Sequence, residues 1–338
     1  MARSLSKPWT DPVKHLITAE SVARLLSGLS GSKSDGLDGV TANHIEHGGP
    51  YLICLLTLHF NGFLNHCYVP DSLTEVCLVP IPKSNAGDMA SLSNYRPIAL
   101  AAAISKFFEK CLYSLISPQI DSSHYQFGFK EGSSTEFCVF ILKSIVQYFW
   151  LFSSPVFACF IDAKAASTDE SFPVLNGGRQ GGILSPLLHN LYLDDLNLLL
   201  EQTGVGCFIG GVCFNNLSCA DDLVILAPTV AALNHLLSIC DEFALANDIV
   251  INTAKTQCMA FISWGNTLKH IPMAWLSGES LSFVGSYKYL GFAVAPTMSD
   301  ELHVKALSRS VCCRANLLIH EIPAEGAVEA LTFPEKKL

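Results

Sequence analysis

Two adjacent acids interrupt an apolar stretch, and this pattern constrains the fold more than any other part of the chain. The stretch Leu217–Ala227 reads as a short apolar run, then Asp221 and Asp222, then a second apolar run. Short runs rich in Leu, Val and Ile that meet at a polar pair are typical of buried strands joined in a β-hairpin. We therefore expect a buried hairpin that presents both carboxylates at its tip.

Two carboxylates held close together repel each other unless a cation lies between them. Mg²⁺ prefers oxygen ligands, and paired Mg²⁺ ions commonly assist phosphoryl transfer. The doublet Asp221-Asp222 is therefore a candidate metal site. Because acids are also common in ordinary turns, the hairpin alone leaves a purely structural role open.

A third acid, Asp162, directly follows the short apolar run Val156–Ile161. An acid at the end of a buried strand is expected at a cleft rather than within the core, although it can also simply end the strand in a turn. A second doublet, Asp194-Asp195, lies in the middle of a leucine-rich helix. We expect the leucines to occupy the buried face of that helix, so both of its acids should point to solvent.

A glycine-rich stretch, Asn176–Pro186, precedes this helix. Its glycines allow the backbone to approach a bulky ligand closely, and Ser185 followed by Pro186 suits the start of a helix. The segments then follow in the order strand 156–161, helix 186–201, hairpin 217–227, helix 230–246 and strand 249–261. This order predicts a β-α-β-β-α-β split unit. That topology would place Asp162 and the hairpin tip on neighbouring strands at one edge of a sheet.

The composition is typical of a folded chain, and we expect no apolar segment to span a membrane. Of the 338 residues, 50% are hydrophobic and 15% charged, and the mean hydropathy is +0.35. Polar residues interrupt both apolar candidates, Tyr51–Phe63 and Cys138–Ile161, so neither offers about 18 uninterrupted apolar residues. No signal peptide is visible, and the 13 Cys show no metal-site spacing. We expect an intracellular protein, nuclear or cytoplasmic, with reduced thiols.

The formal net charge of −9 argues against strong nonspecific binding of nucleic acid, which usually needs a basic surface. A locally basic groove is still possible, but the chain has few Lys and Arg residues with which to build one.

Six motifs in this order resemble the reverse transcriptase domain of non-LTR, LINE-type retrotransposons, most closely a chicken-repeat-like clade. The resemblance covers roughly residues 30 to 295. Its motifs are Asn94–Ile98, Phe160–Asp162, Gln180–Pro186, Ala220–Asp222, Asn252 with Lys255-Thr256, and Tyr289–Gly291. The doublet departs from the family pattern, because Cys219 stands where an aromatic residue is usual.

The resemblance implies an α+β fold of the right-hand polymerase type, whose palm is the split unit predicted above. The expected divisions are an N-terminal helical extension over residues 1–70, fingers over 71–155, the palm over 156–295 and a partial thumb over 296–338.

The implied reaction is two-metal nucleotidyl transfer by an RNA-directed DNA polymerase. Its partners would be an RNA template, a DNA primer and dNTPs, with two Mg²⁺ ions, for which Mn²⁺ is an alternative; the oligomeric state stays open. Asp162 and Asp221 would be the main metal ligands and Asp222 a second-rank ligand. Lys255 would lie near the leaving pyrophosphate. The nucleotide-binding residues would be Lys83, Arg96, Gln180 and Gly181.

One departure predicts that this copy is impaired. The family has several dozen more residues between its first Asp motif and its Gln-Gly motif, whereas Gln180 follows Asp162 after only eighteen positions. The aromatic-Asp pair expected after Ala166, which closes the sugar pocket in the family, is missing. The alternative is a non-catalytic relic that keeps the polymerase fold and binds nucleic acid or protein.

Overall fold

The computed structural model describes residues 17–28, 36, 38–83, 90–91, 94–120, 123–130, 132–162, 181–263 and 270–321. The chain divides into two compact units. The first comprises Met1–Ser133, Lys164–Thr203 and Ser218–Ala220, and the second comprises Ser134–Ala163, Gly204–Leu217 and Asp221–Leu338. The fourfold division into extension, fingers, palm and thumb stays a prediction.

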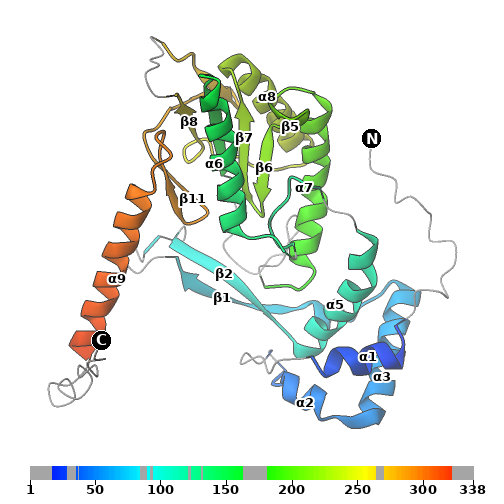
Figure 1. Ribbon diagram of the computed structural model, residues 1–338. Helices are drawn as coiled ribbons and strands as arrows, with labels where there is room; N and C mark the ends of the chain where they lie inside the picture. The colour runs from blue at the N-terminus through cyan, green and yellow to red at the C-terminus, as the bar shows by residue number, and fades with distance from the viewer. Residues whose placement is uncertain are drawn as a thin grey trace, which may run out of the picture. The chain divides into compact units, whose positions relative to one another are not determined.

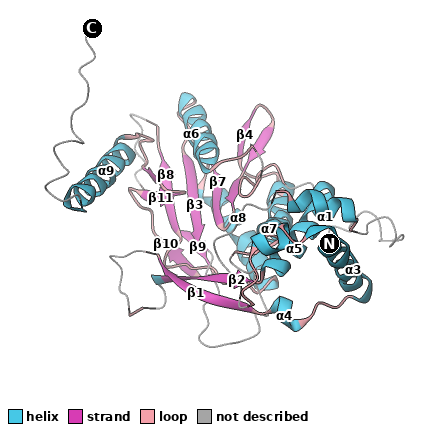
Figure 2. Cartoon of the chain, turned by 90° about the horizontal axis from the view of Figure 1, so that it is seen from below, coloured by secondary structure: helices cyan, strands magenta, loops and turns pink. Residues whose placement is uncertain are grey.

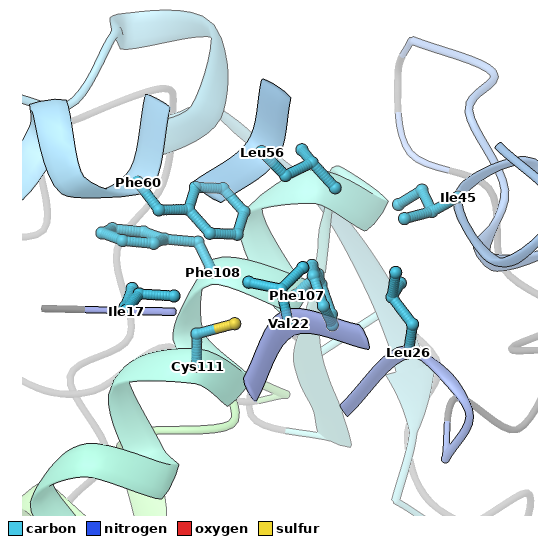
Figure 3. Close-up of a cluster of buried hydrophobic side chains, with 9 residues drawn as sticks. All are labelled: Ile17, Val22, Leu26, Ile45, Leu56, Phe60, Phe107, Phe108 and Cys111. Atoms are coloured by element: carbon cyan, nitrogen blue, oxygen red, sulfur yellow. The ribbon is translucent and has the colours of Figure 1, made fainter. Parts of the chain in front are cut away.

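The first unit has a helical core that mixes aliphatic and aromatic side chains (Figure 3). Helices α1 (Ala19–Leu26), α2 (Ala42–Glu46), α3 (Gly49–His66) and α5 (Ala103–Ile116) supply most of it. The ring of Phe60 lies 4.9 Å from that of Phe108 and 5.9 Å from that of Phe107, measured between centroids. Thr18 caps α1 by accepting a hydrogen bond from the Ser21 N–H.

Two strands extend from this core as an antiparallel ribbon, β1 (Val76–Pro82) and β2 (Tyr95–Ala101). In their register Ile81 lies opposite Arg96. The short α4 (Asp71–Thr74) leads into β1, and η2 (Ser117–Gln119) follows α5. The first unit also contains α7 (Ser185–Gln202).

Helix α7 buries its polar face, which contradicts the prediction from its leucines. The predicted apolar stripe includes Leu188, Tyr192, Leu198 and Leu199, and all four are exposed. The buried residues are instead Asn190, Asp194, Leu196, Asn197 and Leu200. The physical reason is that three of these polar side chains meet hydrogen-bonding groups of neighbouring segments, which offsets the cost of burying them.

A four-stranded sheet has the order β6–β7–β3–β8 (Figures 1 and 2), and all of its residues except Ser218 and Cys219 of β6 belong to the second unit. The strands are β6 (Asn216–Cys219), β7 (Asp222–Ala227), β3 (Val156–Asp162) and β8 (Gln257–Phe261). The central β3 pairs antiparallel with both β7 and β8. All residues of β3 before Asp162 are buried, as expected of a strand covered on both faces.

The faces of this sheet are covered by different elements. Helix α8 (Val230–Ala246) packs on β3 and β7. From β3, Phe160 stacks on Tyr287 at 4.4 Å and lies 5.3 Å from Tyr289. Both tyrosines belong to β11 (Tyr287–Tyr289), and the Tyr289 hydroxyl lies 3.1 Å from the Cys138 sulfur of α6 (Thr135–Leu151).

The remaining elements of the second unit are hairpins and one helix. The hairpins pair β4 (Cys207–Ile209) with β5 (Val212–Phe214), β9 (Ala274–Leu276) with β10 (Glu279–Leu281), and β11 with β12 (Phe292–Val294). Helix α9 is Glu301–Glu321. Within the described residues, no helix has the length and apolar character needed to cross a membrane.

The strand predicted over residues 249–261 is shorter in the structure and begins at Gln257. Before it, the Asn252 carbonyl accepts hydrogen bonds from the N–H groups of both Lys255 and Thr256. These bonds close a tight turn, which is incompatible with a continuous strand. The turn places Asn252 and Lys255 beside the end of β3.

Replacing Phe107 with Ala should lower the free energy of unfolding by about 3–5 kcal/mol, because it opens a cavity in the helical core. Phe107 has no exposed surface. The matched control is Phe140→Ala, whose ring is 63% exposed. Urea unfolding of both variants measures the difference, and an equal loss would show that the helical core is not the packed cluster described.

Candidate active site

The site begins where two paired strands meet. Asp162 is the last residue of β3, and its register partner is Asp222, the first residue of β7. Directly opposed residues of antiparallel strands project from the same face of a sheet. The structure therefore brings Asp162 and Asp222 together, as the topology predicted for the first acid and the doublet. Asp221 is exposed in the turn, whereas Asp222 is half-buried.

The turn that carries the doublet is a two-residue loop, Ala220-Asp221, between the end of β6 and the start of β7. Ala220 has a φ of 56°, in the left-handed region that residues other than glycine seldom adopt. The sequence predicted both acids at the tip. In the structure only Asp221 is in the loop, and Asp222 belongs to the strand.

Asp222 is costly to ionise because of its burial and its neighbouring acids. Burial, then the charges of Asp221 and Asp162, raise the pKa of Asp222 from 3.8 to about 6. Burial, then the negative charges of Asp222 and Asp162, also raise the pKa of Tyr287. Tyr287 is therefore a neighbour of the acids that the sequence analysis missed. Tyr287 belongs to the predicted β segment around Tyr289, but nothing in the sequence of that segment indicated that it lies near the acids.

Three residues of the turn before β8 hold Asp162. The Asn252 side-chain amide donates to Asp162 Oδ2 at 3.1 Å, and the Asp162 N–H donates to the Thr256 hydroxyl at 3.2 Å. The Lys255 ammonium lies 4.0 Å from Asp162 Oδ2. Because Lys255 is largely exposed, this ion pair contributes little stability. Lys255 thus lies beside Asp162, and its predicted role at the leaving pyrophosphate stays a prediction.

The donors at this site suit a hard divalent cation. Asp162 and Asp222 offer carboxylate oxygens on one face, and a cation would relieve the repulsion that raises the pKa of Asp222. Across the described ranges, no three or more His, Cys, Asp and Glu side chains form a group that could hold a metal. Mg²⁺ is usually bound by one or two carboxylates together with substrate phosphates, so a carboxylate pair fits this ion.

The predicted nucleotide-binding residues belong to the first unit. Arg96 is exposed on β2, and Lys83 directly follows β1, where its N–H donates to the Asn94 carbonyl at 2.6 Å. Gly181 has a φ of 112°, and a Cβ there would lie 3.0 Å from the Ala99 carbonyl oxygen. Only glycine suits this close approach to β2. Gln180 lies outside the described residues.

The second acid doublet does not face solvent as predicted. Asp195 is exposed, but Asp194 is buried, and both of its carboxylate oxygens accept the Ser123 N–H at 3.2 Å. Asp194 therefore has a structural contact, and Asp195 is the better exposed control for substitutions at the metal site.

Replacing Asp222 with Asn should remove one pH-dependent part of the stability. The pKa of Asp222 in the folded chain lies above its ordinary value of 3.8, so the folded chain binds this proton more tightly than the unfolded chain does. The contribution of Asp222 to stability therefore falls as the pH rises from 3.8 to about 6. The unfolding free energy of the unsubstituted chain minus that of the variant should fall across this range. Urea titrations in metal-free buffer measure the difference, and a value that stays constant across this pH range would contradict the prediction.

Comparisons with known proteins agree with this geometry. Residues 142–294 match the family model described as reverse transcriptase (RNA-dependent DNA polymerase). The RNA-directed DNA polymerase from mobile element jockey of Drosophila funebris is 23% identical over 370 residues, covering 92% of this chain and 38% of that protein. The probable RNA-directed DNA polymerase from transposon BS of Drosophila melanogaster is 23% identical over 361 residues, covering 88% and 38%.

A third relative, the probable RNA-directed DNA polymerase from transposon X-element of Drosophila melanogaster, is 24% identical over 338 residues, covering 84% of this chain and 36% of that protein. The chain thus spans 38% or less of the length of these relatives. The placement in a chicken-repeat-like clade stays a prediction. Residues 142–294 of this chain thus match the reverse transcriptase family model, and the chain as a whole is similar to RNA-directed DNA polymerases of Drosophila mobile elements.

Proposed function

We propose that this chain is the RNA-directed DNA polymerase domain of a LINE-type element and binds an RNA template, a DNA primer and dNTPs. The observation that carries the proposal is the pairing of Asp162 with Asp222 beside Asp221, Asn252 and Lys255. The sheet order β6–β7–β3–β8 supports a split β-α-β-β-α-β palm within a right-hand polymerase fold.

In the proposed reaction, the primer 3′-hydroxyl releases its proton to solvent and its oxygen bonds to the α-phosphorus of a dNTP, while the bond from that phosphorus to the bridging oxygen breaks and pyrophosphate leaves. Divalent ions, when bound, would supply activation of the hydroxyl and neutralisation of the phosphates. Asp162, Asp221 and Asp222 would hold them. Asn252 orients the Asp162 carboxylate through its hydrogen bond.

The remaining residues would act on phosphate charge. The exposed ammonium of Lys255 is available to the leaving pyrophosphate, and Lys83 and Arg96 would bind the triphosphate. Gln180 and Gly181 would pack against the nucleotide, and the close approach of Gly181 to β2 leaves no room for a side chain toward Ala99.

We further propose that polymerisation by this copy is weak. The alignment with the Drosophila funebris relative extends over 370 residues, more than the 338 residues of the whole chain, so the relative has residues without a counterpart here. We infer that some of the residues without a counterpart fall between Asp162 and Gln180, where the spacing is short. Because such catalysis depends on positioning, a displacement of about 1 Å can cost on the order of 100-fold. The net charge of −9 also disfavours tight binding of template and primer.

Replacing Asp162 with Asn should weaken Mn²⁺ binding on the order of 10-fold or more, since even a lost partner outside the ligand shell costs about 10- to 100-fold. Asp221→Asn and Asp222→Asn should weaken it as well. Titration of Mn²⁺ followed by electron paramagnetic resonance measures the affinity. Asp195→Asn is the matched control, and a loss equal to that of Asp162→Asn would contradict the site.

The activity test is primer extension on a primed RNA with Mg²⁺, using this chain and a version with the family-length segment restored. We expect weak extension by the first, stronger extension by the second and none by Asp162→Asn of either. Robust extension by the unrestored chain would contradict the proposed impairment. Binding of primed RNA without extension by either version would favour the non-catalytic relic.

A further inference from the structure

The segment 125–128 runs beside the doublet hairpin and contacts it through its backbone. The Phe127 N–H donates to the Ser218 carbonyl, and the Ser218 N–H donates to the Tyr125 carbonyl, both at 2.8 Å. Gln126 and Ser218 thereby form a parallel bridge. A single parallel bridge therefore joins this segment to β6, close to the turn that leads into Asp221.

Gln126 contacts the turn itself. Its side-chain oxygen accepts the Ala220 N–H at 3.2 Å and the Gly128 N–H at 2.8 Å. Ala220 is the residue with the unfavourable left-handed φ, directly before Asp221. Strained backbone of this kind persists only where surrounding contacts hold it. The Gln126 oxygen supplies such a contact.

Two further observations show that this contact is built into the fold. Gln126 is completely buried, and its side-chain nitrogen has no hydrogen-bond partner within the described part of the chain. A Cβ on Gly128 would lie 2.2 Å from the Ala220 nitrogen, so only glycine allows this approach. Among the described residues, Gln126 therefore makes its side-chain hydrogen bonds through its acceptor oxygen.

The buried polar stripe of α7 holds the same two segments. The Asn190 amide donates to the Gly128 carbonyl at 2.8 Å, Asp194 accepts the Ser123 N–H, and the Ser218 hydroxyl donates to the Asn197 side-chain oxygen at 2.9 Å. Spacings of four and three residues place these side chains on one face of the helix. Helix α7 thus fixes both the segment that carries Gln126 and the strand that carries the turn.

We propose that Gln126 is a positioning residue for the catalytic doublet: by accepting the Ala220 N–H, it holds the turn that aims Asp221 and Asp222. This inference rests on the proposed function, since it assumes that the doublet binds a divalent ion. It assigns Gln126 no contact with metal or substrate. Its effect on the reaction is carried through the conformation of Ala220.

The test compares three variants of the full chain. Gln126→Met keeps the length of the side chain but removes the acceptor, and should weaken Mn²⁺ binding about 10- to 100-fold, as loss of a supporting hydrogen bond does at other metal sites. Gln126→Glu keeps an acceptor oxygen and should restore most of the affinity. Gln147→Met changes an exposed glutamine of α6 and should have no effect. Circular dichroism monitors folding.

A merely structural role would lower the stability of Gln126→Met and leave the Mn²⁺ affinity of its folded fraction unchanged, which would overturn the proposal. Failure of Gln126→Glu to recover affinity would also overturn it. If Gln126→Met does not fold, Gly128→Ala takes its place, with Gly62→Ala, which meets nothing within 4 Å, as control.

Amide hydrogen exchange in the unsubstituted chain tests the contact between Gln126 and Ala220 without any substitution. The Ala220 amide should be protected, and exchange as fast as that of an unstructured peptide would overturn the contact. If the unsubstituted chain binds Mn²⁺ no better than Asp162→Asn, the proposed function fails, and the positioning role fails with it even when Ala220 is protected. If that binding is intact and Gln126→Met retains it, only the positioning role fails.

Discussion

The antiparallel pairing of β3 with β7 is the constraint on which the candidate site depends. A slip of one residue in this register would turn the side chains of one strand to the opposite face. Both strands are buried except at their acidic ends, so a slip that drew either carboxylate into the apolar interior would bury a charge at high cost. The energy of apolar burial is thereby used to hold Asp162 opposite Asp222, where the two charges repel. A divalent cation would remove that repulsion, which links the fold to the proposed chemistry.

Around this pair, the structure replaces apolar contacts with polar ones. Buried amides and carboxylates on α7, together with Gln126, hold the backbone near the doublet. Such groups are costly to bury unless they are bonded, but their hydrogen bonds have direction, which apolar contacts lack. The left-handed Ala220 lies where these contacts converge. We interpret this network as an arrangement that sacrifices some stability in order to orient the doublet, as the proposed reaction requires.

Several features of the fold and the site could be predicted from residue patterns. The buried runs around Asp162 and the doublet indicated strands, and their order along the chain indicated a sheet that brings them together; the observed pairing confirms that they meet. The patterns misjudged α7, because hydrophobic periodicity assumes that apolar residues face the core, and here Asn190, Asp194 and Asn197 have buried partners instead. They also overextended the strand before Thr256, because the hydrogen bonds of the turn at Asn252 are invisible in a run of β-branched residues.

What the sequence determined by itself is the local chemistry: which segments are apolar enough to be buried strands, where the acids end them, and which motifs resemble a reverse transcriptase. Only the tertiary structure decided that Asp222 is the register partner of Asp162, that Tyr287 joins the acids, and that Gln126 holds Ala220. The reason is physical. Secondary structure depends on contacts between residues close in sequence, whereas these pairings join segments 60 to 125 positions apart, and the packing of the whole sheet and of α7 selects them.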